Sequence, residues 1–398
     1  MLPPNFSPRW LDFGWILCPN RLLFPMAEVK IAADRGRETA SFGDSTMSER
    51  IATKSGDVVD LFCGAGGLSH GFYREYFNIV AGLDVDQTCR YAFEKNNHSN
   101  FYAKDVRNVT GTWLNGLQWN FPRILAGCAP CQPFSVYNRN NKDSRWKLLR
   151  EFSRLVEETL PDIVTMENVP ALLKYHKGKV FGDFKSTLDA CGYDVWHGVV
   201  FCPEYGVPQR RNRLILLASK HGEIEMIDPE YKSGDFPTVE KAIKFLPRIK
   251  AGAVCPKDPL HKAANLSNIN KARIRQSKQG GSWLDWEKSL VSRCHIRDTG
   301  RRFLSAYSRM RWDEPAPTIT TYFHGFSNGR FGHPSQDRAL SLREGALLQS
   351  FPEEYIFSEE GQPIRMKEVG RMIGNAVPPR LAQAIAKSIN HHLQERLT

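Results

Sequence analysis

No stretch of this sequence approaches the roughly 18 consecutive apolar residues that a membrane-spanning helix requires. The most apolar part of the N-terminus, residues 10–24, is interrupted by Asp12, Pro19 and Arg21 and does not follow a basic n-region. It therefore lacks the features of a secretory signal peptide. We expect neither a membrane helix nor an exported protein.

The nine cysteines form no disulfide framework, because their number is odd and their spacing is irregular. This usage is typical of a reducing compartment. Cys128 and Cys131 form a C-x-x-C pair, but the other seven cysteines supply no second pair at the spacing of a zinc site. We expect no metal site. A redox-active pair of the thioredoxin kind stays open as an alternative.

Acidic residues are scarce in one segment. Residues 241–311 carry 17 Lys and Arg against four Asp and Glu, an excess larger than the net charge of +11 on the whole chain. In this segment Arg301, Arg302, Arg309 and Arg311 flank Tyr307. Basic residues concentrated in one module favour a polyanionic partner such as a nucleic acid.

A glycine-rich turn, residues 63–69, lies between a buried-strand pattern at 57–62 and a helix-like segment, but it lacks the full G-x-G-x-x-G fingerprint. Glycines at such a turn let the backbone approach a ligand at a helix N-terminus. The next predicted strand, 78–83, ends at Asp84, whose carboxylate suits a ribose diol. These features predict a nucleotide-like cofactor rather than a dinucleotide.

A second loop, residues 127–135, holds Cys131 directly after Pro130. Pro130 stiffens the loop because its φ angle is fixed. A thiolate in such a loop is well placed to act as a nucleophile, although most free cysteines are buried small apolar residues. The loop leads to a predicted helix at 146–160.

The helix at 146–160 is followed by a predicted strand, 162–166, which ends at Glu167. A crossover helix makes the two flanking strands parallel, so Cys131 and Glu167 are both predicted at carboxyl ends of strands. Open α/β sheets place their sites there. Farther on, Arg211 and Arg213 project to the same side of an extended segment.

These motifs, in this order, resemble the DNA (cytosine-5-)-methyltransferase family of the bacterial restriction–modification type. The resemblance covers roughly residues 57–219 and 312–393 and includes Asp-Leu-Phe-Cys-Gly-Ala-Gly-Gly-Leu-Ser, Pro-Cys-Gln, Glu-Asn-Val-Pro and Gln-x-Arg-x-Arg. It implies that Cys131 is the nucleophile, that Glu167 assists at the base, and that Arg213 holds the base with the support of Arg211. It also implies base flipping and a transient covalent Cys131 adduct. The sequence departs from the family at Cys128, where glycine is frequent.

The resemblance further implies S-adenosyl-L-methionine as the cofactor, held without a metal. Phe62 is expected near the adenine, Asp105 at its amino group, and Val85 where the family often has an aromatic residue. The cofactor-binding residues that the resemblance implies are Phe62, Gly64, Gly66, Gly67, Leu68, Asp84, Val85, Asp105, Val106, Pro130, Asn375 and Val377.

The predicted fold is α/β: a Rossmann-like S-adenosylmethionine-dependent methyltransferase fold with a mixed sheet, joined to a smaller basic DNA-recognition domain. We expect an N-terminal extension at 1–46, a catalytic and cofactor-binding domain at 47–219, a target-recognition domain at 220–345, and a C-terminal segment at 346–398 that returns to the catalytic domain.

The expected partner is double-stranded DNA, acted on by a cytoplasmic, DNA-associated monomer that can share its site with a cognate restriction endonuclease. Two alternatives of related ancestry stay open. One is a tRNA cytosine-5 methyltransferase of the same fold, and the other is an inactive DNA-binding relative. The intact set of Cys131, Glu167 and Arg213 argues against the second.

Overall fold

The computed structural model describes residues 55–130, 143–298 and 300–397. Cys131 therefore lies outside the described residues, as does the whole of the expected extension at 1–46. The described residues belong to one unit, Thr46–Thr398. In that part of the chain no helix is long and apolar enough to cross a membrane.

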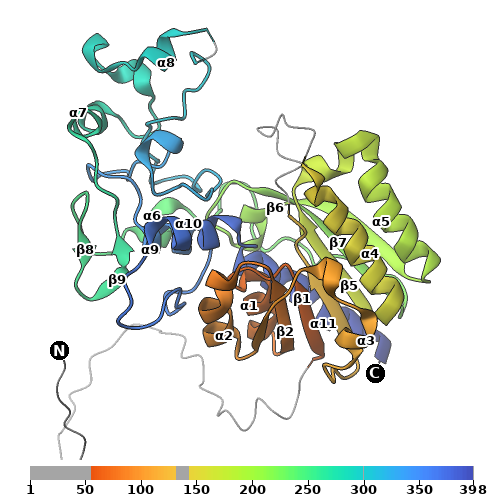
Figure 1. The fold of residues 1–398 in the computed structure, drawn as a ribbon. Helices are drawn as coiled ribbons and strands as arrows, with labels where there is room; N and C mark the ends of the chain where they lie inside the picture. Colours follow the sequence, from red (N-terminus) through yellow and green to blue (C-terminus); the bar gives the residue numbers. More distant parts are fainter. Residues whose placement is uncertain (1–54, 131–142, 299, 398) are drawn as a thin grey trace, which may run out of the picture. The chain divides into compact units, whose positions relative to one another are not determined.

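A seven-stranded sheet organises the described residues, in the order β3-β2-β1-β4-β5-β7-β6 (Figure 1). Strands β1 to β5 are parallel, and β7 runs antiparallel to both of its neighbours. The strands of this sheet are β1 (Asp57–Leu61), β2 (Asn78–Asp84), β3 (Asn100–Ala103), β4 (Arg123–Gly127), β5 (Ile163–Asn168), β6 (Asp194–Phe201) and β7 (Asn212–Ser219). The predicted mixed α/β fold is confirmed.

Eleven α-helices lie within the described residues, several of them short. They are α1 (Gly67–Arg74), α2 (Arg90–Asn97), α3 (Gly111–Asn115), α4 (Leu148–Thr159), α5 (Lys179–Ala190), α6 (Val239–Ile243), α7 (Asn268–Gln276), α8 (Arg293–Ile296), α9 (Leu342–Leu348), α10 (Met366–Asn375) and α11 (Pro379–Leu397).

Alternate residues of each central strand face opposite sides of the sheet and enter two separate cores. Ile124 of β4 joins the core that contains Phe72 of α1 and Ile385 of α11. Its neighbour Leu125 joins the core that contains Phe152 of α4 and Phe184 of α5. The sheet is thus covered on both faces, which explains why its strands are continuous apolar runs (Figure 1).

The C-terminal helix α11 packs closely on the first helix, α1. A Cβ atom at Gly71 of α1 would lie 2.2 Å from Cβ of Ala382 of α11, so only glycine permits this approach. The end of the chain therefore returns to the glycine-rich turn that precedes α1.

The chain continues after β7 into a segment that lies outside the seven-stranded sheet. The segment that follows has a two-stranded sheet of its own, formed by β8 (Val254–Cys255) and β9 (Asp258–Lys262). It also has a small separate core that includes Trp283, Trp286 and Phe326.

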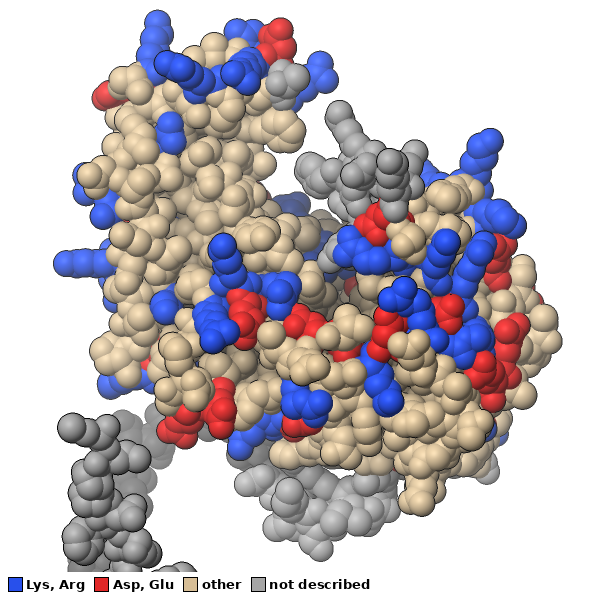
Figure 2. Space-filling model, in the orientation of Figure 1, with Lys and Arg blue, Asp and Glu red and all other residues tan. Residues whose placement is uncertain are grey.

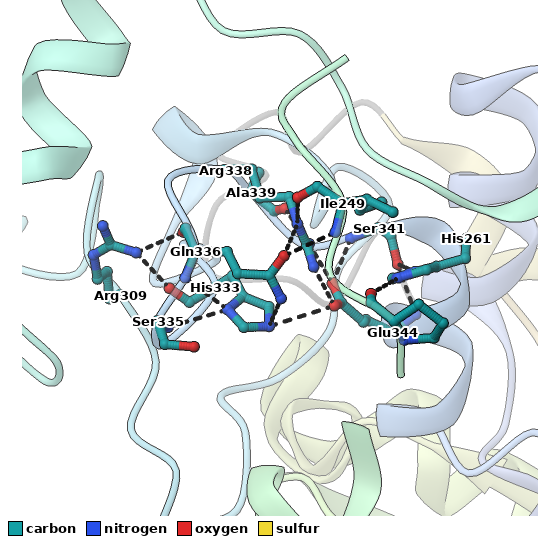
Figure 3. A network of polar contacts seen from close by, with 11 residues as sticks. Ile249, His261, Arg309, His333, Ser335, Gln336, Arg338, Ala339, Ser341 and Glu344 are labelled. Atoms are coloured by element: carbon teal, nitrogen blue, oxygen red, sulfur yellow. Dashed lines mark hydrogen bonds and ion pairs between the residues drawn. The ribbon is translucent and has the colours of Figure 1, made fainter. Parts of the chain in front are cut away.

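A buried polar network joins this segment to α9 (Figure 3). Arg338 donates to both carboxylate oxygens of Glu344, at 2.7 and 2.6 Å, and both side chains are almost completely buried. Burial alone would raise the pKa of Glu344, but the hydrogen bonds and charge of Arg338 lower it to about 2. Glu344 also completes a capping box with Ser341 at the start of α9.

Candidate active site

Glu167 lies at the centre of the candidate site, buried at the carboxyl end of β5. Its Oε1 atom is 2.6 Å from Nε of Arg213, and its Oε2 atom is 2.8 Å from Sγ of Cys128. The exposed fraction of the Glu167 side chain is only 3%. A carboxylate buried this deeply needs a paired charge, and Arg213 supplies it.

The strand register brings these three side chains together. Gly127 of β4 pairs with Met166 of β5, so Cys128 and Glu167 are the next residues along adjacent parallel strands. Glu167 also pairs with Ile215 of β7, and Arg213 lies two residues from Ile215 on the same side. The register of β4, β5 and β7 therefore accounts for a cluster formed from three strands.

Arg211 is buried beside Gln209, a residue whose role the sequence analysis did not identify. Nη1 of Arg211 donates to Oε1 of Gln209 at 3.4 Å and to the carbonyl of Ile319 at 3.3 Å. The Gln209 amide in turn donates to Oε1 of Gln349 at 2.6 Å, and Gln349 donates to the carbonyl of Ala376 at 2.7 Å. A chain of hydrogen bonds thus links the arginine run to the C-terminal segment.

Asn168 anchors the start of the loop that leads to Cys131. Its side-chain amide donates to the carbonyl of Ala129 at 3.0 Å, and Asn168 is buried. Pro130, the last described residue before the loop, is half-buried. The Glu-Asn pair at the end of β5 therefore provides one side chain to the candidate site and one to its loop.

Asp84 closes the glycine-rich turn from the neighbouring strand. Its Oδ2 atom accepts from the backbone N–H of Gly64 and its Oδ1 atom from that of Asp86, both at 2.9 Å. Burial raises the pKa of Asp84. The carboxylate is therefore held in one orientation at the end of β2.

The structure around Gly64 fits a bound ligand. A Cβ atom at Gly64 would meet nothing within 4 Å, although φ there is +51°. Phe62 is half-buried with φ at +63°, and Val85 is 66% exposed. Open space beside an oriented carboxylate and two partly exposed apolar side chains suits a nucleoside.

Gly66 and Gly67 are required for contacts within the protein. A Cβ atom at Gly67 would lie 2.3 Å from the carbonyl oxygen of Val377, and one at Gly66 would lie 2.2 Å from the side-chain amide of Asn97. The hydroxyl of Tyr355 donates to the carbonyl of Ala65 at 2.5 Å. The turn is thus packed against Asn97, Tyr355 and Val377, which lie farther along the chain.

The remaining predicted cofactor residues occupy different environments. Leu68, Val106 and Val377 are buried, whereas Asn375 is exposed at the end of α10. Asp105 is paired with Arg107, whose Nε lies 3.0 Å from each carboxylate oxygen. The hydrogen bonds from Arg107 lower the pKa of Asp105.

A second buried carboxylate, that of Asp60, lies beneath the turn and was not singled out from the sequence. It accepts from Oγ of Ser69 at 2.6 Å, and burial raises its pKa to about 7. Among the residues that the structure describes, no group of three or more His, Cys, Asp or Glu side chains could hold a metal ion.

The basic segment contains both structural and exposed cations. Arg309 is buried and donates to the carbonyls of Ser277, Ile274, His333 and Gln336. Figure 2 shows mainly Lys and Arg among the charged side chains over α7 and α8. The exposed basic residues there and in the following turn are Arg275, Lys278, Lys288, Arg293, Arg297, Arg301 and Arg302.

The sheet order, the glycine-rich turn and the strand-end carboxylates define a methyltransferase-type α/β fold. A sequence model of the C-5 cytosine-specific DNA methylases matches residues 56–391, and the chain belongs to this family. It is a DNA cytosine-5 methyltransferase.

Three similar proteins illustrate the relationship. The Type II methylase M.HgiDII of Herpetosiphon aurantiacus is 48% identical over 85% of this chain and 96% of its own. The Type II methyltransferase M1.HphI of Haemophilus parahaemolyticus is 31% identical over 83% and 86%. A solved Escherichia coli structure, described as a prophage-encoded DNA modification methyltransferase, has a TM-score of 0.66 at 23% identity over 85% and 99%, which shows a shared fold.

Proposed function

We propose that the protein transfers a methyl group from S-adenosyl-L-methionine to carbon 5 of a cytosine within a specific duplex DNA sequence. The observation that carries this proposal is the buried contact of Glu167 with Arg213, at the strand edge from which the Cys131 loop leaves. Relatives named as Type II enzymes favour a role in restriction–modification beside a cognate endonuclease, acting on DNA in the bacterial cytoplasm.

The target cytosine has to leave the base stack before these side chains can reach it, at a cost of about a few kcal/mol. The Cys131 thiolate then bonds to carbon 6 and makes carbon 5 nucleophilic. Glu167 holds or donates a proton at ring nitrogen 3, and Arg213 stabilises charge at the exocyclic oxygen. Arg211 supports this end of β7 through Gln209.

The cofactor supplies an activated methyl group on its sulfonium. Asp84 would hold the ribose, with Phe62, Val85, Asp105 and Val106 around the adenine. Carbon 5 takes the methyl group, a base removes the carbon-5 proton, and the Cys131–carbon 6 bond breaks. Gly64 provides room for the ligand, while Val377 shapes the turn through Gly67.

We further propose that residues 220–345 form the recognition module, with their exposed basic side chains against phosphate. Such contacts position a protein on DNA without reading its sequence. Arg309 is excluded from that role by its buried backbone contacts.

The test is incubation with labelled S-adenosylmethionine and either unmethylated genomic DNA or tRNA, with a Cys131→Ser variant in parallel. We expect label at carbon 5 of cytosine in DNA and none with the variant. Label on tRNA alone would indicate a tRNA cytosine-5 methyltransferase of the same fold. DNA binding without label on either substrate would indicate an inactive binding protein.

A further inference from the structure

Cys128 contacts the candidate catalytic carboxylate directly. Its Sγ atom lies 2.8 Å from Oε2 of Glu167. Nε of Arg213 lies 2.6 Å from the other carboxylate oxygen, Oε1. The contact follows from the register of β4 and β5, which places residues 128 and 167 side by side on one face. Glycine at position 128 would offer no such group.

The chemistry of the two groups gives the contact a direction. A carboxylate oxygen accepts a hydrogen bond, whereas a thiol carries one weak donor. The S–H of Cys128 therefore donates to Oε2 of Glu167. The terminal torsion of a glutamate side chain is broad and roughly two-fold, so the ion pair at Oε1 and the hydrogen bond at Oε2 together fix the plane of the carboxylate.

The surroundings of this contact restrict the position of Cys128. The backbone N–H of Cys128 donates to the carbonyl of Leu61 at 3.3 Å, which extends the pairing of β4 with β1. Among the described residues, the side chains near Glu167 include Arg213, which pairs with it, and Cys202, which interacts with it electrostatically. Burial raises the pKa of Cys202 to about 11, so this thiol stays protonated at neutral pH.

We propose that Cys128 is a positioning residue, whose thiol orients the Glu167 carboxylate toward ring nitrogen 3 of the flipped cytosine. The inference rests on the proposed function, because the proposed function assigns Glu167 to ring nitrogen 3. Cys128 touches neither substrate nor cofactor in this role and acts through Glu167.

The first test needs no catalysis. In a Cys131→Ser background, alkylation of Cys128 by iodoacetamide is followed by tandem mass spectrometry with Glu167 and with Glu167→Gln. A carboxylate that accepts the S–H bond opposes thiolate formation, so we expect Cys128 to react about fivefold to tenfold faster in the Glu167→Gln protein. Cys191, at the end of α5, is the internal control. A change no larger than that of Cys191 would overturn the proposal.

The second test separates hydrogen bonding from packing. We expect Cys128→Ala to lower kcat for methyl transfer about fivefold to tenfold with KM for DNA unchanged. Cys128→Ser should remain within about twofold, because a hydroxyl also donates. Equal loss in both variants would show that only the packing of sulfur matters and would contradict the proposal. The unsubstituted protein in the same assay tests the proposed function separately.

Discussion

Nε of Arg213 lies 2.6 Å from Oε1 of Glu167, and the two side chains are only 10% and 3% exposed. Removing one partner of a buried ion pair leaves an uncompensated charge, which costs about 3–5 kcal/mol. We therefore expect Arg213→Ala to lower the free energy of unfolding by this amount and to abolish methyl transfer, as measured by denaturant unfolding and initial rates.

The same arginine run offers a matched control. Arg210 is paired with Glu314 at 3.4 Å, but its side chain is 55% exposed. Exposed pairs contribute roughly 0–1 kcal/mol. Arg210→Ala should therefore leave stability nearly unchanged, and a loss as large as that of Arg213→Ala would contradict the account.

Glu167→Gln is expected to lower kcat by at least about 100-fold, the range typical of general acid–base groups. Cofactor binding should persist, because Glu167 is not among the predicted cofactor-binding residues and Arg213 keeps a polar neighbour in this variant. Initial rates and calorimetric titration with S-adenosylmethionine check the two parts. Nearly full activity of the Gln variant would remove Glu167 from the mechanism.

Gly67→Ala is expected to destabilise the protein by roughly 1–3 kcal/mol, the usual cost of overpacking. The new Cβ would lie 2.3 Å from the carbonyl oxygen of Val377, so the C-terminal segment has to shift and cofactor affinity should fall. Gly182→Ala is the control in α5, because its Cβ would meet nothing within 4 Å. Alanine there should stabilise the helix by about 0.5–1 kcal/mol.

The contribution of the Arg338–Glu344 pair should depend on pH. Its carboxyl pKa is lowered to about 2 from a usual 4.5. An acid with a depressed folded-state pKa stabilises the protein above pH 4.5, and this stabilisation is lost as the pH falls toward 2. Melting temperatures of the protein and of a Glu344→Gln variant, compared at pH 7 and pH 3, should converge at the lower pH. An equal gap at both pH values would contradict this assignment.

Asp84→Asn should weaken cofactor binding by at least about tenfold, because an amide offers one acceptor oxygen where the carboxylate offers two to Gly64 and Asp86. Burial raises the pKa of Asp84 above its usual value of 3.8. As the pH is lowered, the affinity for S-adenosylmethionine should therefore begin to fall before pH 3.8 is reached. Calorimetric titration with S-adenosylmethionine measures both effects. Asp183→Asn on α5, a half-exposed surface aspartate, should leave the affinity unchanged.

The sequence predicts the sheet well because each central strand is a continuous apolar run. The predicted strands at 57–62, 78–83 and 162–166 agree with β1, β2 and β5 to within two residues at each end. The strand β3, with only four residues, was not recognised, because it is too short to show a clear period.

The contacts of the candidate site depend on residues far apart in the chain, and local patterns do not reveal them. Gln209 meets Gln349 across 140 residues, and Tyr355 reaches Ala65 across 290. Charge counting is limited in a similar way. It treats Arg309 as one more basic surface residue, although Arg309 is buried and bonded to backbone carbonyls.

The most direct measurement is the intact mass of the protein after incubation with S-adenosylmethionine and a duplex that carries 5-fluorocytosine at the target position. Fluorine at carbon 5 cannot leave as the proton does, so the Cys131–carbon 6 bond should persist. The account predicts a stable complex with the mass of protein, DNA and one methyl group, absent in Cys131→Ser. An equally stable complex in Cys131→Ser, or none with the unsubstituted protein on DNA that it methylates, would contradict the covalent role of Cys131.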